Sequence, residues 1–280
     1  MIDAPVSGPA DPRPSDPLPT EAPAPPAFDR RVFATIALAT LVATFVGMPY
    51  GEFLIAQGPA LKRLGDPFTR LVVLELLTVL GTWPLAAIGL KLGARMGLGA
   101  PMLAAWLRGR PIGARARHGL LVATLSGLAF GAALLLLFAV FKTPMAAEMA
   151  RLGPTSVPPP AWMGVLGSLA AGVNEETVLR LFLMTTIAAF AWRLVPRTTA
   201  LWIANGIAAL VFGALHFGNV FALGLNFSPF LVAFILLVNG GIGLLCGRLY
   251  WTYGIEAAMA AHVACDLVLH GLGPALGATA

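Results

Sequence analysis

The feature that most constrains this chain is a series of long apolar runs separated by short polar connections. Each run has about the 20 residues that a helix needs to cross a bilayer. Because the runs are continuous and do not alternate apolar with polar residues, they predict helices rather than barrel strands. The sequence therefore predicts an all-α fold, a polytopic membrane helical bundle of about seven transmembrane helices, near residues 32–56, 70–92, 119–141, 161–192, 200–219, 228–249 and 253–271.

Composition supports a membrane protein. Apolar residues make up 58% of the chain and charged residues only 11%, whereas soluble domains carry roughly 25% charged residues. The formal charge of +5 comes from basic residues in the short connections between apolar runs, where they act as topology signals. We therefore expect membrane lipids and no nucleic acid as partners.

The termini differ from the membrane part. Residues 1–28 contain nine prolines and almost no large apolar side chains, a composition typical of a disordered tail. The tail lacks the basic start and apolar centre of a secretory signal peptide. We predict one transmembrane domain over residues 29–272 and a short C-terminal tail over residues 273–280. More basic residues fall in the connections that share a side with the N-terminus, which predicts a cytoplasmic N-terminal tail.

The most informative stretch is Asn174-Glu175-Glu176-Thr-Val-Leu-Arg180, inside the fourth apolar run. Charged groups at membrane depth are expensive and indicate a functional site. Glu176 and Arg180 are four residues apart, so on a helix they share a face and neutralise each other. Glu175 points about 100° away on a helix and lacks that partner. An unpaired carboxylate in an apolar pocket suits a general base; the alternative is a structural polar lock between helices.

Two histidines on later runs have a neighbour one helical turn away. Phe212 and His216 share one face, and His262 and Asp266 share another. Asp266 would orient the imidazole, or both groups would approach a common atom. Helices of a bundle build sites from such inward-facing side chains. We therefore expect these residues to meet the glutamates in a polar cavity.

Glu175-Glu176-x-x-x-Arg180, Phe212-x-x-x-His216 and His262-x-x-x-Asp266, on successive spans, resemble the motifs of the CAAX-protease and bacteriocin-processing (CPBP) intramembrane proteases, also called the abortive-infection family. The resemblance covers roughly residues 160–270. It implies a helical bundle in which water attacks a peptide bond of a membrane-associated substrate, either prenylated or leader-type. By this resemblance Glu175 is the base, His216 holds the water, and His262 stabilises the oxyanion, with Glu176, Arg180 and Phe212 in support.

Position 266 departs from the family, which usually has asparagine there. An ionised aspartate cannot donate a hydrogen bond to an oxyanion. Asp266 would instead orient His262, stay protonated, or ligate a metal. Glu175, His216, His262 and Asp266 are acceptable zinc ligands, but the chain has no His-Glu-x-x-His helix. A metal-free mechanism is favoured over a zinc mechanism, and both stay open.

Two other functions are compatible with the same polar cluster. The first is a proton- or cation-coupled carrier, since buried carboxylates and histidines also form proton relays; the sequence shows no internal repeat of the kind common in transporters. The second is a catalytically silent immunity or scaffold protein. Residues 254–262 resemble the corresponding stretch of bacterial members of the family, so we expect a bacterial inner membrane.

Overall fold

The computed structural model describes residues 28–57, 65–153, 157 and 159–275, and no strand occurs among them. Helices make up the architecture, as the sequence predicts. In chain order they are α1 (Arg30–Gln57), α2 (Pro67–Leu77), η2 (Thr78–Thr82), α3 (Trp83–Met96), α4 (Pro101–Leu107), α5 (Ala114–Leu152), α6 (Ala161–Glu176), η3 (Thr177–Met184), α7 (Thr185–Ala191), α8 (Arg197–Leu215), α9 (Phe217–Ala222), α10 (Pro229–Tyr253), α11 (Ile255–Asp266), η4 (Leu267–Leu272) and α12 (Gly273–Ala275).

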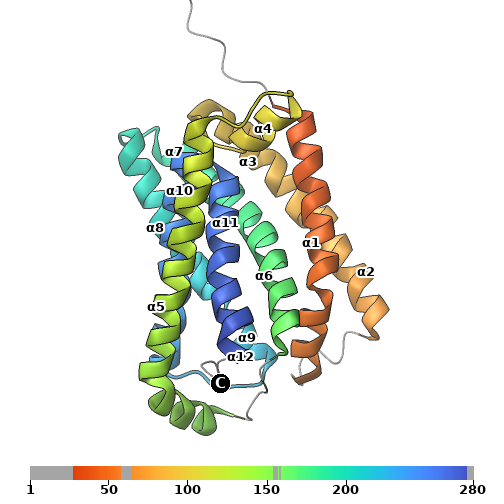
Figure 1. Cartoon of the computed structure of the whole chain (residues 1–280), viewed down its shortest axis with the longest axis vertical. Coiled ribbons are helices and arrows are strands. Elements are labelled where there is room, and N and C mark those ends of the chain that lie inside the picture. Colours follow the sequence, from red (N-terminus) through yellow and green to blue (C-terminus); the bar gives the residue numbers. More distant parts are fainter. Residues whose placement is uncertain (1–27, 58–64, 154–156, 158, 276–280) are drawn as a thin grey trace, which may run out of the picture.

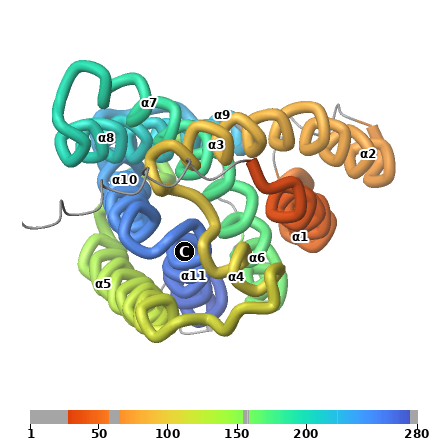
Figure 2. Tube along the Cα trace, turned by 90° about the horizontal axis from the view of Figure 1, so that it is seen from above, coloured from red at the N-terminus to blue at the C-terminus, as the bar shows by residue number. Residues whose placement is uncertain are grey.

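The long helices run roughly along one axis and form a bundle (Figure 1). Seen from its end, the bundle places α11 among α5, α6 and α10, whereas α2 lies at the edge (Figure 2). Burial agrees with this arrangement. In the most apolar window of each span, 50% of residues are buried for Ile255–Leu272 and only 11% for Pro67–Met96. The helix that carries His262 is therefore the most enclosed of these spans.

Six helices of the described chain are long and apolar enough to cross a membrane, which confirms a polytopic helical protein. They match six of the seven predicted spans. The remaining predicted span, residues 161–192, is the fourth along the chain. It corresponds to α6, η3 and α7, which follow one another without a break. This segment is not among the six, and it is the one that carries Glu175, Glu176 and Arg180. The charged side chains that indicate a functional site are also the ones that lower the mean hydropathy of this segment.

The predicted N-terminal tail lies almost entirely outside the described residues, which begin at Phe28. The predicted C-terminal tail begins with the short helix α12, and its last five positions, 276–280, are also outside the described part. Both tails stay predictions.

Local sequence signals explain where several helices begin. Asp66 precedes α2 and accepts hydrogen bonds from the amides of Phe68 and Thr69, which satisfies donors that a helix start leaves free. The hydroxyl of Thr69 also donates to this exposed carboxylate, and these bonds lower the pKa of Asp66 below its ordinary value. Ser228 plays the same capping role for α10, where its hydroxyl oxygen accepts from the amide of Leu231.

The turn into α11 requires a glycine. Gly254 has φ of 106°, a conformation that side chains other than glycine rarely adopt. The next amide, that of Ile255, donates to the carbonyl of Gly99 at 2.9 Å. This bond anchors the start of α11 to the connection between α3 and α4. It therefore helps to set the position of His262 along the axis of the bundle.

Helix α5 approaches α11 closely because it presents glycine at the contact. A Cβ atom on Gly127 would lie 2.2 Å from the carbonyl oxygen of Ala261, and one on Gly131 would lie 2.8 Å from that of Cys265. Small residues of this kind let membrane helices pack backbone against backbone. The contact lies beside His262, so packing and site geometry are linked.

Within the described residues three π-helical stretches interrupt the α-helices, and two of them begin at the predicted site. η3 starts directly after Glu176, and η4 starts directly after Asp266. η2 starts at Thr78, whose hydroxyl contacts the hydroxyl of Thr44 at 3.0 Å. π-Helical turns are rare and are frequent at functional sites. No local sequence pattern predicts these interruptions.

We expect Gly127→Ala to destabilise the protein by about 1–3 kcal/mol, because the added methyl forces α5 away from α11. Thermal unfolding of purified protein in detergent measures the effect. Gly206→Ala is the matched control, since a Cβ there would meet nothing within 4 Å. Equal melting temperatures for the two variants would contradict the close contact.

Candidate active site

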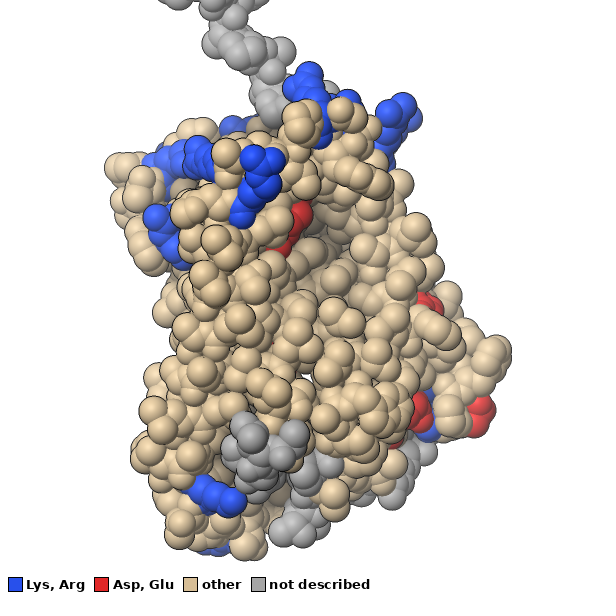
Figure 3. Space-filling view, in the orientation of Figure 1, with Lys and Arg blue, Asp and Glu red and all other residues tan. Residues whose placement is uncertain are grey.

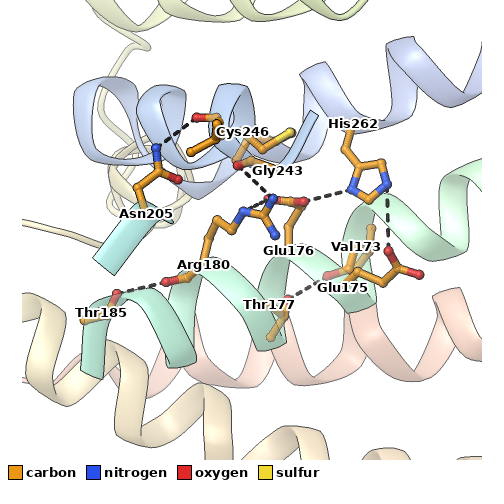
Figure 4. Close-up of polar contacts among 12 residues, drawn as sticks. Val173, Glu175, Glu176, Thr177, Arg180, Thr185, Asn205, Gly243, Cys246 and His262 are labelled. Carbon is orange, nitrogen blue, oxygen red and sulfur yellow. Dashed lines mark hydrogen bonds and ion pairs between the residues drawn. The ribbon is translucent and has the colours of Figure 1, made fainter. Parts of the chain in front are cut away.

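The site lies where α6 passes into η3, facing α11, α10 and α8. Figure 4 shows Glu176 between Arg180 and His262, with Glu175 on the other side of the imidazole. Glu176, Arg180 and His262 are buried, with 0%, 0% and 3% of their surfaces exposed. Charged groups at this depth are stable only when they are paired and hydrogen-bonded.

Glu176 is the centre of the buried network. Its Oε2 lies 3.2 Å from Arg180 Nε, which is the ion pair that the four-residue spacing predicts. Its Oε1 lies 2.8 Å from His262 Nδ1. Arg180 also donates to the carbonyl of Gly243 at 3.0 Å, and its guanidinium lies 5.0 Å from the centre of the Phe212 ring. One carboxylate therefore connects η3 with α11, and the arginine extends the network to α10 and α8.

The imidazole of His262 has a fixed proton on one nitrogen. A carboxylate without a proton only accepts, so Nδ1 donates its proton to Glu176. Nε2 then faces two other carboxylates, Asp266 Oδ2 at 3.5 Å and Glu175 Oε2 at 3.9 Å. His262 is thus oriented by Glu176, and its second nitrogen points toward the side of the site where Glu175 lies.

Glu175 is the carboxylate without a close partner. Its side chain is 38% exposed, yet its Oε2 atom is shielded and accepts no hydrogen bond among the described residues. Glu175 lines a cavity of about 290 Å³ together with Val178, Leu179 and His216. An unpaired carboxylate beside a cavity can take a proton from a group that enters it.

His216 reaches the same cavity from the end of α8. Its Nδ1 lies 2.9 Å from the carbonyl oxygen of Phe212, and a carbonyl only accepts, so Nδ1 carries a proton. In the neutral ring Nε2 is therefore an acceptor. The Phe212 ring contacts both histidines edge to face, with centroid distances of 4.8 Å to His216 and 5.5 Å to His262. Phe212 thus separates the two imidazoles and holds both in place.

The structure brings together all the residues that the sequence singled out, with one change in their partners. The helical spacing predicts that Glu176 pairs with Arg180 and that Glu175 faces the two histidines. Instead, His262 donates to Glu176 and lies farther from Glu175. The reason is that Glu176 lies on the buried face of α6, toward α11, whereas Glu175 faces the cavity.

Some polar residues of this region carried no signal in the sequence. Asn174, which also lines the cavity, donates to Thr44 of α1 at 3.1 Å. Asn205 is fully buried on α8 and donates to the carbonyl of Leu244 at 3.0 Å. In the sequence, the only hint is that each asparagine lies within an apolar run. The partners could not be predicted, because the two residues of each pair are far apart in the chain.

The described residues do not form a metal site. No group of three or more histidine, cysteine, aspartate or glutamate side chains among them is arranged to hold a metal ion. His262 has one nitrogen committed to Glu176, and its other nitrogen is 3.5 Å and 3.9 Å from the nearest carboxylate oxygens. We therefore derive no step through a metal ion, and zinc ligation stays an alternative.

The fold and the site define an integral membrane protein with an acid–base cluster inside its helical bundle. Residues 157–268, which make up less than half of the chain, match the family described as type II CAAX prenyl endopeptidase Rce1-like. The match confirms the resemblance found in the sequence and supports an intramembrane endopeptidase in general. No curated protein and no solved structure matches the chain.

We expect Arg180→Met to destabilise the protein by about 3–5 kcal/mol, because it leaves Glu176 as a buried carboxylate without its cation. The double variant Glu176→Gln/Arg180→Met removes both charges and should recover part of that loss. Thermal unfolding in detergent compares the two. A double variant no more stable than the single one would show that the uncompensated charge is not the cause.

Proposed function

We propose that the protein is an intramembrane endopeptidase in which Glu175 activates water to hydrolyse a peptide bond of a membrane-associated substrate. One observation carries the proposal: Glu175, whose Oε2 accepts no hydrogen bond among the described residues, lines a cavity that His216 also lines. A base and a water-holding acceptor at one enclosed space are the minimum that hydrolysis by water requires.

The proposed reaction begins with a water molecule between Glu175 and His216. Nε2 of the neutral His216 accepts one hydrogen bond from the water, and Glu175 removes the other proton. The resulting hydroxide attacks the carbonyl carbon, and the carbonyl oxygen becomes an oxyanion. When the intermediate collapses, the carbon–nitrogen bond breaks and Glu175 returns the proton to the leaving amine.

His262 is the proposed oxyanion donor. Its Nδ1 proton is committed to Glu176, so His262 donates to the developing charge as the imidazolium, with a second proton on Nε2 beside the carboxylates of Asp266 and Glu175. Glu176 and Arg180 act through His262, since they hold the ring in one orientation. Their role is positioning, comparable to that of the carboxylates that orient histidines in other enzymes.

The proposed substrate is a peptide with an apolar, membrane-associated part. The cavity combines apolar walls, which include Val178, Leu179 and Leu215, with the polar groups Glu175 and His216. The name of the matching family refers to prenylated CAAX sequences, so a prenylated peptide is the first candidate and a leader-type peptide the second. Membrane lipids are the expected surroundings, and we propose no nucleic-acid partner.

We propose a cytoplasmic orientation for the end of the bundle where α3 and α4 lie. Lys and Arg side chains gather at this end of the face in Figure 3, and Arg30, Lys91, Arg108 and Arg115 are exposed in the corresponding segments. An excess of basic residues marks the cytoplasmic side of membrane proteins. The N-terminal tail would then be cytoplasmic, in a bacterial inner membrane.

We expect Glu175→Gln to lower cleavage of a prenylated CAAX peptide by about 10²–10⁴-fold, since the amide cannot accept the proton of water. The assay uses purified protein in liposomes, with melting temperature as the measure of folding. Glu75→Gln is the matched control, because Glu75 is another glutamate in a span but does not line the cavity. Wild-type cleavage by a folded Glu175→Gln variant would refute the proposal.

The same preparation also tests the carrier alternative. Proton or cation flux into liposomes that depends on Glu175, in protein without peptidase activity, would favour a carrier. A folded wild-type protein with neither activity would favour the silent scaffold.

We expect Asp266→Asn to keep or increase peptidase activity. Glu176 already orients His262 from Nδ1, so the Asp266 carboxylate, 3.5 Å from Nε2, is not required for that purpose. An asparagine amide could in addition donate to the oxyanion. Cleavage rates of the purified variant measure the effect.

Complete loss of activity in folded Asp266→Asn would instead indicate a function that needs a carboxylate. Metal content of the active wild-type protein, measured by element-resolved analysis together with a chelator assay, then distinguishes metal ligation from other functions. Stoichiometric metal and chelator-sensitive activity would overturn the metal-free mechanism.

A further inference from the structure

Asn174 has an unused hydrogen-bond acceptor beside the proposed base. It precedes Glu175 on α6 and lines the same cavity. Its amide nitrogen donates to Thr44 Oγ1 at 3.1 Å, whereas its Oδ1 is shielded from solvent and has no partner among the described residues. A buried acceptor without a donor is unfavourable, so a group that enters the cavity with a donor would be stabilised there.

Two threonines fix which side of the Asn174 amide faces them. Thr44 Oγ1 donates to the carbonyl of Thr40 at 2.9 Å and lies 3.0 Å from Thr78 Oγ1. A hydroxyl has a single proton. A Thr44 hydroxyl that donates to Thr40 or to Thr78 therefore only accepts from Asn174. This assigns the amide nitrogen to the Thr44 side and directs the carbonyl oxygen away from it.

Two residues that line the cavity carry acceptors with no hydrogen bond among the described residues, Asn174 Oδ1 and Glu175 Oε2. In the proposed reaction, water supplies an O–H donor to Glu175. Asn174 Oδ1 then remains available to a second donor, and a bound peptide brings such donors into the cavity. Every peptide bond next to the scissile one, unless it precedes proline, presents an N–H within a residue of the reacting carbonyl.

We propose that Asn174 is a substrate-binding residue whose Oδ1 accepts the backbone N–H of a peptide bond adjacent to the scissile bond. The contact selects a peptide backbone in register with Glu175, whatever the side chains are. α1 and η2 contribute to substrate binding through Thr44 and Thr78, which hold the amide in its orientation. This inference rests on the proposed peptidase function.

The test combines a change in the enzyme with a change in the substrate. The probe is a prenylated peptide with a C-terminal CAAX sequence, cleaved by purified protein in liposomes, and its analogues are N-methylated in turn at each amide that flanks the scissile bond. We expect Asn174→Leu to lower kcat/KM by about 10- to 100-fold, mostly through KM. One N-methylated analogue should lower wild-type kcat/KM by a similar factor.

Coupling between the two changes is the decisive result. If Asn174 accepts that N–H, the same analogue should lower kcat/KM of Asn174→Leu by less than about twofold, because the bond is already absent. Asn239→Leu is the control, since Asn239 bonds only to the carbonyl of Ile235 in its own helix at 2.9 Å and does not line the cavity. It should keep the full wild-type sensitivity to N-methylation.

Thr44→Val provides a second variant if Asn174→Leu does not fold. It removes the acceptor that orients the amide, so sensitivity to the same analogue should fall. If N-methylation lowers kcat/KM of both variants by the same factor as kcat/KM of the wild type, the role of Asn174 is overturned. The proposed function would survive that result as long as Glu175→Gln is inactive, and would itself fail if Glu175→Gln cleaves normally.

Discussion

The carboxylate of Glu176, held between Arg180 and His262, is the interaction on which the rest of the site depends. A single charge at this depth would be strongly unfavourable, and three ionisable groups are tolerated because each supplies a partner to the next. The network also uses the Gly243 carbonyl as an acceptor. Since its members come from α6, η3, α10 and α11, correct packing of these helices is required before the charges can pair.

Glu175 differs from Glu176 for the same reason. Glu176 has an ion pair with Arg180 at 3.2 Å and a hydrogen bond from His262 at 2.8 Å, whereas Glu175 has only the more distant Nε2 of His262, at 3.9 Å. Adjacent positions on one helix thus have different roles because they face different surroundings. This separation of a structural carboxylate from a reactive one is the arrangement from which acid–base roles are commonly recognised.

Much of the fold follows from sequence because the bilayer imposes a length and an apolar composition on each span. The predicted span 228–249 corresponds to Pro229–Tyr253, and 253–271 to Ile255–Leu272. The ion pair of Glu176 and Arg180 follows from helix periodicity alone. The bond from His262 to Glu176 does not, because it depends on the rotation of α11 about its axis relative to α6, which no local pattern records. The link from Asn174 to Thr44 escaped prediction for the same reason, since its partners are 130 residues apart.

The π-helical stretch η3 begins directly after Glu176 and contains Arg180, and η4 begins directly after Asp266. A π turn contains more residues than an α turn, so it rotates the following helix face relative to the preceding one. The part of the helix that presents Glu175 or His262 can therefore keep its rotational setting while the part beyond packs against its neighbours at another angle. Evolutionary gain or loss of one residue beyond the site would then be absorbed within the wide turn, and the reactive groups would keep their alignment.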